Sequence, residues 1–239
     1  MSARGALLLH GKWDVPDGAM RPLAETLVDG GWRVRCPRCC WSPRRHYDVP
    51  FAAALVEVRA EIDRLRADGC DFVLVAGHSL GANAALAAAA ADAPADALAL
   101  IAPGHRPETL RAAGLTTDAL AAARAAGPDR RLRLPDFNQG RRRLLRFRAD
   151  IWLSFFDPAG DAVMAHAARR LAFPRPVLWI DAAHSGGPDD SADSTFDLLP
   201  PHPQNLRIMV DSSHVAAPAA AITPVREWLQ ALEGQRWTT

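Results

Sequence analysis

The stretch Val73-Leu74-Val75-Ala76-Gly77-His78-Ser79-Leu80-Gly81-Ala82-Asn83-Ala84-Ala85-Leu86 decides the fold. It opens as an apolar run typical of a buried strand and closes as an alanine-rich run that favours a helix. Between the two runs stands Gly-x-Ser-x-Gly, a spacing that occurs by chance in many turns. In a strand-to-helix context, however, it places the serine hydroxyl outward at the top of a sheet, beside the N–H groups that open the helix. We therefore predict Ser79 as a nucleophile.

Length and composition favour a single domain without a polyanionic partner. The chain has 239 residues, of which 49% are hydrophobic, so one α/β domain over 1–239 can bury a sizeable core. The 28 basic and 27 acidic residues nearly cancel, which argues against nucleic acid or an anionic membrane as partner. Almost all basic residues are arginine, and Lys12 is the only lysine.

The sequence carries no recognised targeting or metal signal. No run reaches the roughly 20 apolar residues of a membrane span, and Gly5–Leu9 is too short for a signal-peptide core, so we expect a cytoplasmic protein. Cys36-Pro37-Arg38-Cys39-Cys40 contains a Cys-x-x-Cys pair near His46, but no second pair completes a zinc spacing. Reduced cysteines at a strand end are the favoured interpretation, and no metal is expected.

Apolar runs alternate with helical periodicity along most of the chain. Strands are predicted at Ala6–Leu9, Trp32–Val34, Phe72–Val75, Ala97–Ala102, Pro176–Ile180 and Leu206–Val210. Helices are predicted at Pro22–Val28, Phe51–Leu65, Leu80–Ala91 and Ile222–Leu232. Strands written as unbroken apolar runs and separated by helices indicate an α/β fold, with a mostly parallel sheet covered by helices on both faces.

Such a sheet binds ligands beyond the carboxyl ends of its strands. This rule places five segments along one rim: His10-Gly11, Ser79, Pro103-Gly104-His105, Asp181–Asp190 and His214. Within this set, His10 and His105 are candidates for contact with a substrate.

A long excursion interrupts the alternation at 105–173, and we interpret it as a lid or cap inserted in the domain. It is partly helical, at Thr117–Ala126, Ala149–Phe156 and Asp161–Leu171, and it carries the arginine-dense segment Asp129–Arg148. A solvated helical face and a substrate-contacting role both remain open for it.

His214 is the predicted base for Ser79. Serine needs a base to take its proton, and that base needs a third group to hold its tautomer. His214 follows the last strand through Asp211-Ser212-Ser213 and precedes the final helix, so a loop at the rim presents it.

These residues together resemble the α/β-hydrolase family of serine hydrolases, over nearly the whole chain. The resemblance rests on Gly77-His78-Ser79-Leu80-Gly81, His10-Gly11 after the first strand, and His214 after the last. It implies a compact six-strand member that lacks the first two antiparallel strands. It also implies an oxyanion hole made by the backbone N–H of Lys12 or Trp13 and by that of Leu80.

The third triad member departs from the family pattern. The family commonly places an Asp after the second-to-last strand, where this chain has Ser185. Nearby alternatives are Asp181, Asp189, Asp190 and Asp193, with Asp157 as a candidate from the lid. We favour Asp190 and then Asp189, because the Gly186-Gly187-Pro188 turn is long enough to bring either towards His214.

The leading hypothesis is a serine hydrolase that cleaves an ester or thioester of a small molecule through an acyl-enzyme on Ser79, without metal or organic cofactor. A non-catalytic small-molecule-binding protein on the same fold is the alternative, supported by the unplaced acid. Acyl transfer to an acceptor other than water is a third possibility. The sequence is silent on the substrate's identity and on the oligomeric state.

Overall fold

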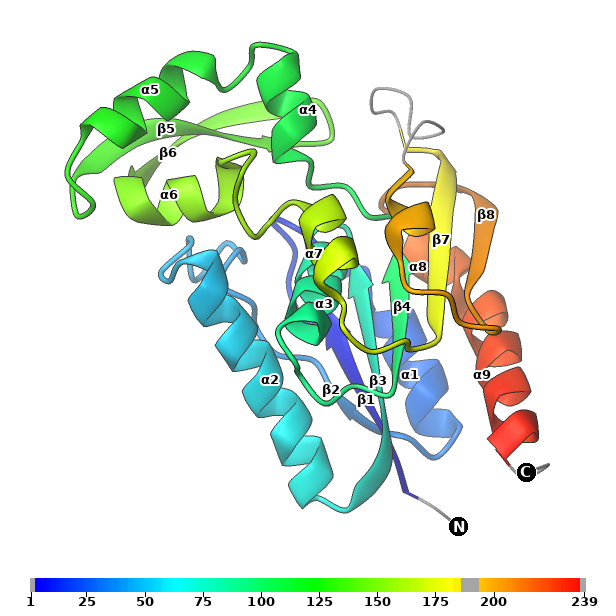
Figure 1. The fold of residues 1–239 in the computed structure, drawn as a ribbon. Coiled ribbons are helices and arrows are strands. Elements are labelled where there is room, and N and C mark those ends of the chain that lie inside the picture. Colours follow the sequence, from blue (N-terminus) through cyan, green and yellow to red (C-terminus); the bar gives the residue numbers. More distant parts are fainter. Residues whose placement is uncertain (1–2, 186–193, 237–239) are drawn as a thin grey trace.

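The computed structural model describes residues 3–185 and 194–236. Its centre is a six-stranded sheet in the order β2-β1-β3-β4-β7-β8, with every neighbouring pair parallel (Figure 1). The strands are β1 (Ala3–Leu9), β2 (Arg33–Arg35), β3 (Cys70–His78), β4 (Ala97–Ile101), β7 (Val177–His184) and β8 (Leu206–Ser213). The predicted α/β class and the six strands are confirmed.

Helices cover both faces of this sheet, as Figure 1 shows. On one face lie α2 (Phe51–Ala67), α3 (Leu80–Ala90) and α7 (Met164–Arg170). On the other lie α1 (Arg21–Asp29), α8 (Ala217–Ala220) and α9 (Ile222–Arg236). A short 3-10 helix, Ser194–Leu198, follows β7.

Side chains alternate along the strands between two separate cores. In β1, Leu7 and Leu9 pack with α2 and α3, whereas Ala6 and Leu8 pack with α1 and α9. Because both faces are buried, the central strands have few polar positions, and the apolar runs in the sequence follow from this.

The segment between β4 and β7 leaves the sheet at the carboxyl ends of the strands and forms a small lobe there (Figure 1). We call residues 102–176 the insert. It contains α4 (Pro107–Ala112), α5 (Thr117–Ala125), β5 (Arg131–Asn138), β6 (Arg141–Arg148) and α6 (Ala149–Phe156), and it returns through α7. Strands β5 and β6 pair as an antiparallel hairpin, an element that the sequence patterns did not predict.

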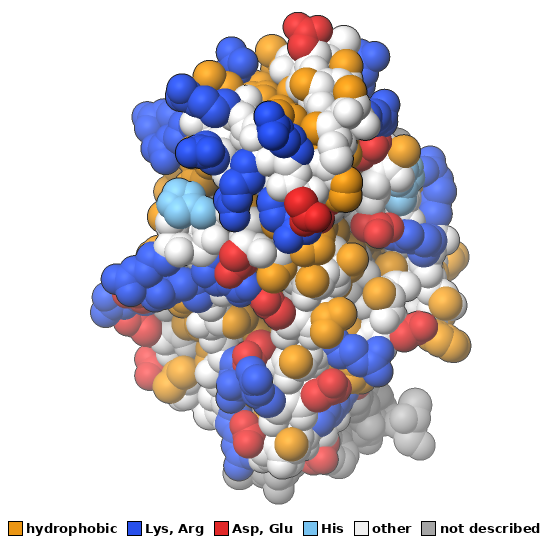
Figure 2. Space-filling model, turned by 90° about the vertical axis from the view of Figure 1, so that its left-hand side faces the viewer, with side chains coloured by type: hydrophobic (Ala, Val, Ile, Leu, Met, Phe, Trp, Pro, Cys, Tyr) orange, Lys and Arg blue, Asp and Glu red, His pale blue; other side chains and the backbone are white. Residues whose placement is uncertain are grey.

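The hairpin turns tightly through two residues with left-handed backbone, Gln139 (φ 49°) and Gly140 (φ 72°). Two consecutive positive φ angles match the twist of a two-residue hairpin loop. Figure 2 shows that Lys and Arg side chains gather on the upper part of the molecule, over the insert. Among the described residues, no helix is both long and apolar enough to cross a bilayer.

Candidate active site

Ser79 stands on a strained turn between β3 and α3. Its backbone has φ 54° and ψ −121°, and its N–H donates to the carbonyl of Ile101 at 3.0 Å, which extends the pairing of β3 with β4. A Cβ on Gly77 would overlap the backbone of Gly81, and a Cβ on Gly81 would overlap the carbonyl of Leu9. Both glycines of the motif are therefore required by close backbone approach.

The structure brings Ser79 and His214 together around Gly104. An ideal Cβ built on Gly104 would lie 3.2 Å from Ser79 Oγ and 3.4 Å from His214 Nε2. Both reactive atoms thus face the same small space, although 135 positions of sequence separate the residues. Ser79 is 6% and His214 is 7% exposed, so access to them runs through cavities in the surface.

His78, beside the nucleophile, holds the loop that carries His214. Its Nε2 lies 2.9 Å from the carbonyl oxygen of His214, and the two rings are 5.0 Å apart at their centroids. Because a carbonyl only accepts, Nε2 of His78 carries the proton. Burial, with a further contribution from His214, lowers the pKa of His78 to about 3, so its ring stays neutral. His78 therefore positions the loop that carries His214.

The loop after β1 contains two of the predicted oxyanion donors, Lys12 and Trp13. The backbone N–H of Trp13 donates to the carbonyl of Trp41 at 3.3 Å, so it is engaged within the loop. This contact favours Lys12 over Trp13 as the donor from this loop. Leu80 begins α3, and the first N–H groups of a helix have no acceptor within it. Its N–H is the other candidate donor.

A buried cluster that the sequence did not reveal supports this loop. Asp136 of β5 is fully buried and accepts from Lys12 Nζ (2.9 Å), Trp13 Nε1 (2.6 Å) and the Tyr47 hydroxyl (2.9 Å). Burial lowers the pKa of Lys12, and the carboxylate of Asp136 opposes that shift. One weak signal existed: Asp136 is the only acid between Arg130 and Arg148, and Lys12 is the only lysine.

His105 belongs to the same cluster. Its Nε2 donates to the carbonyl of Phe155 at 2.6 Å, and its Nδ1 accepts from Lys12 Nζ at 3.3 Å. Burial and the charge of Lys12 hold its pKa well below the ordinary value. His105 lines the smaller cavity at Ser79, but both ring nitrogens have protein partners.

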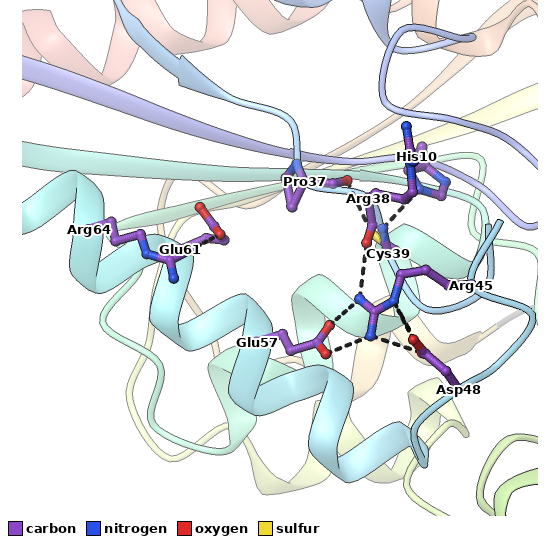
Figure 3. A network of polar contacts seen from close by, with 9 residues as sticks. All are labelled: His10, Pro37, Arg38, Cys39, Arg45, Asp48, Glu57, Glu61 and Arg64. Carbon is purple, nitrogen blue, oxygen red and sulfur yellow. Dashed lines mark hydrogen bonds and ion pairs between the residues drawn. The ribbon is translucent and has the colours of Figure 1, made fainter.

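His10 lies behind the site instead. Its Nδ1 donates to the carbonyl of Gly11 (2.8 Å), and its Nε2 accepts from the N–H of Cys39 (3.1 Å) (Figure 3). It lines neither cavity at Ser79. A nearby cavity of about 350 Å³ lies between the segment Pro37–Arg45 after β2 and helix α2, beside the Arg45–Glu57 ion pair. It shares no lining residue with the two cavities at Ser79.

The four cysteines are free thiols, and all but Cys36 are buried. Burial raises the pKa of Cys36 to about 11 and that of Cys40 to about 12. Thiols with such pKa values are protonated at neutral pH, which makes them poor nucleophiles.

The favoured acids, Asp189 and Asp190, lie outside the described residues, as does Asp193. Two of the other candidates have partners elsewhere. Asp181 accepts from Trp179 Nε1 (2.9 Å) and pairs with Arg207 (2.8 Å), and Asp157 pairs with Arg124 (2.9 Å). Ser185, at the position where the family commonly has Asp, lines the smaller cavity.

Among the residues that the structure describes, two cavities are lined by both Ser79 and His214. The larger one, about 590 Å³, lies between the loop after β1 and the tip of the β5–β6 hairpin. The smaller one, about 140 Å³, runs beneath α4. The insert walls both cavities, so it shapes whatever binds at Ser79.

Comparisons with known proteins agree with this architecture. Residues 6–233 match the model of the Alpha/beta hydrolase family, and the chain therefore belongs to that family. A comparison with curated protein sequences gave no match.

The similar solved structures have low sequence identity to this chain. The monoacylglycerol lipase of Paleococcus ferrophilus is 17% identical, with 96% of each chain covered and a TM-score of 0.68. Est1E of Butyrivibrio proteoclasticus with bound ferulic acid is 16% identical over 96% of this chain and 89% of that one (TM-score 0.65). A thioesterase domain from the curacin biosynthetic pathway is 18% identical over 95% and 91% (TM-score 0.59). At these identities the likeness shows the fold alone.

Proposed function

We propose that this protein hydrolyses an ester or thioester of a small molecule through an acyl-enzyme on Ser79. The observation that carries the proposal is the approach of Ser79 Oγ and His214 Nε2 to one point, 3.2 and 3.4 Å from the position of a Gly104 Cβ. The presence of a monoacylglycerol lipase and a thioesterase domain among the similar structures supports chemistry of this kind.

The chemistry follows from the placement of the groups. His214 Nε2 takes the proton of Ser79 Oγ as the oxygen attacks the substrate carbonyl carbon. Backbone N–H groups of Leu80 and Lys12 donate to the oxyanion of the tetrahedral intermediate. His214 then returns the proton to the departing alcohol or thiol. Water attacks the acyl-enzyme by the same route, which releases the acid and restores Ser79.

The third group of the triad is proposed as Asp190, with Asp189 as the alternative. Its role is to hold His214 in the tautomer whose Nε2 accepts a proton, and to stabilise the imidazolium that forms.

A fluorophosphonate probe tests the proposal. Wild-type protein should be labelled stoichiometrically, and Ser79→Ala should abolish labelling. Ser42→Ala, which removes a buried hydroxyl that has no hydrogen-bond partner among the described residues, should leave labelling intact. Between Asp190→Asn and Asp189→Asn, the variant that slows labelling identifies the acid. A folded wild-type protein that stays unlabelled would contradict the proposal and favour the binding protein.

A further inference from the structure

Two arginines of the hairpin lie on the face that packs against the rest of the molecule. In an antiparallel pair, directly opposite residues share a face. Arg143 stands opposite Asp136, and Arg141 stands opposite Asn138. Asp136 is fully buried, and Asn138 Nδ2 donates to the carbonyl of Lys12 at 3.1 Å. Arg141 and Arg143 therefore share the face that meets the loop after β1.

Both arginines line the cavity of about 590 Å³ that contains Ser79 and His214. The guanidinium carbon of Arg143 lies 4.1 Å from the ring centre of Trp13, a stacking contact that holds the cation at the cavity wall. Within residues 3–185 and 194–236, neither guanidinium forms an ion pair, whereas Arg148 on the opposite face pairs with Asp129 and Asp150.

The charges that line this cavity leave an excess of positive charge. Its wall holds the cations Lys12, Arg141 and Arg143 and one carboxylate, Asp14. Lys12 is already paired with Asp136, and Asp14 accepts from the N–H of Ala19 at 3.1 Å. The two arginines therefore remain available to an anion beside the nucleophile.

We propose that the substrate is an ester or thioester that carries an anionic group, a carboxylate or phosphate, bound by Arg141 and Arg143. The inference rests on the function proposed for Ser79 and adds the class of substrate. Guanidinium groups match these anions because paired N–H donors meet two oxygens at once. The anion positions the substrate, with its carbonyl carbon at Ser79 Oγ.

The anionic group belongs either to the acyl part or to the leaving group, and two substrate pairs separate these sources. Mono-p-nitrophenyl glutarate and its neutral methyl ester differ in charge on the acyl side. Butyryl-coenzyme A and the butyryl thioester of N-acetylcysteamine differ in charge on the leaving side. The pair with the larger charge preference identifies the source.

The decisive variants remove equal charge from opposite faces of one strand. Arg141→Gln/Arg143→Gln removes both cavity arginines, and Arg142→Gln/Arg146→Gln removes two exposed arginines of the outer face. We expect the first double variant to lose at least about tenfold in kcat/KM for the anionic member of one pair, mainly through KM. The neutral member should change less than about twofold, and the control variant should behave as wild type.

Two outcomes would overturn the inference: no preference for the anionic member of either pair, or equal losses in both double variants. Binding of the same four compounds to Ser79→Ala protein, measured by calorimetry, requires no turnover and keeps the two proposals separate. If the anionic compound binds more tightly and the arginines account for it, anion recognition holds even where wild type shows no hydrolysis. If neither anionic compound is preferred while neutral esters are turned over, the inference fails and the proposed hydrolase stands.

Discussion

Gly104 lies beside both reactive groups of the candidate site, so a single methyl group added there tests the geometry. The Cβ of Gly104→Ala would lie 2.7 Å from His214 Cε1, closer than van der Waals contact permits. Because Gly104 lacks a positive φ, the backbone tolerates alanine and the imidazole must move instead.

We expect Gly104→Ala to reduce kcat for an ester by about 100-fold, because a displacement of about 1 Å is enough for such a loss. The rate of fluorophosphonate labelling should fall with it, while urea unfolding shows a stability within about 1 kcal/mol of wild type. Gly127→Ala is the control, since nothing lies within 4 Å of a Cβ at that position. Unchanged activity in Gly104→Ala would mean that His214 acts from another position.

Helix α3 is hydrogen-bonded to both ends of the insert through one side chain, that of Asn83. Asn83 Nδ2 donates to the carbonyl of His105, near the start of the insert, at 2.6 Å, and to that of Ala162, near its end, at 3.0 Å. Because both carbonyls are buried, losing these donors leaves them unsatisfied.

Asn83→Ala should therefore loosen the insert more than the sheet. We expect the free energy of local opening to fall by about 1–3 kcal/mol, seen by mass spectrometry as faster hydrogen exchange in peptides of residues 105–163. Peptides from β3 should keep their protection. Thr116→Ala provides the comparison, because its buried hydroxyl has no partner among the described residues. Equal exchange in the two variants would show that other contacts hold the insert.

For the molecule as a whole, interior histidines make stability depend on pH. The folded pKa of His78 is about 3 and that of His105 lies well below 6.5, both lowered first by burial. From about pH 6.5 down to about pH 3, the unfolded chain binds protons that the folded protein does not. Stability is therefore fully present above about pH 6.5 and falls as the pH drops.

Urea unfolding at pH 7.5, 6, 5 and 4 measures this slope. Each neutral buried histidine contributes up to about 1.4 kcal/mol per pH unit within the window. His78→Gln keeps a donor for the His214 carbonyl but cannot take up a proton, so it should reduce the slope by about one histidine's share. His46→Gln, at an exposed position, serves as the control. An unaltered slope in His78→Gln would contradict a neutral His78.

The central strands and the turn at Ser79 could be predicted from the sequence, because a local sequence pattern specifies each of them. The central strands β1, β3, β4 and β7 contain continuous apolar runs because both faces of the sheet are buried there. The turn at Ser79 could be predicted from its two glycines. Ser79 and His214 were named from their places at strand ends, and the structure brings them together. Such inferences need only the order of elements, not their contacts.

The hairpin and the Asp136 cluster were missed for a different reason. Strands β5 and β6 alternate, but arginines occupy both faces near the tip, so the period of two is hidden in the arginine-dense segment. Asp136 lies 124 positions from Lys12 in the sequence, and no local pattern joins them. Contacts of this kind depend on how the insert packs over the sheet. The secondary-structure propensities of the residues do not determine that packing.

Chemical modification of Lys12 can report when the insert separates from the loop after β1. Lys12 is the only lysine of the chain, and its side chain is buried beside Asp136. A reagent that acylates amines at neutral pH therefore finds no accessible lysine side chain on the folded molecule. Incorporation at Lys12, as distinct from the α-amino group, therefore counts excursions in which the insert separates from the loop after β1. The rate at which the insert separates from this loop can be measured in this way on the native protein, without an engineered tag.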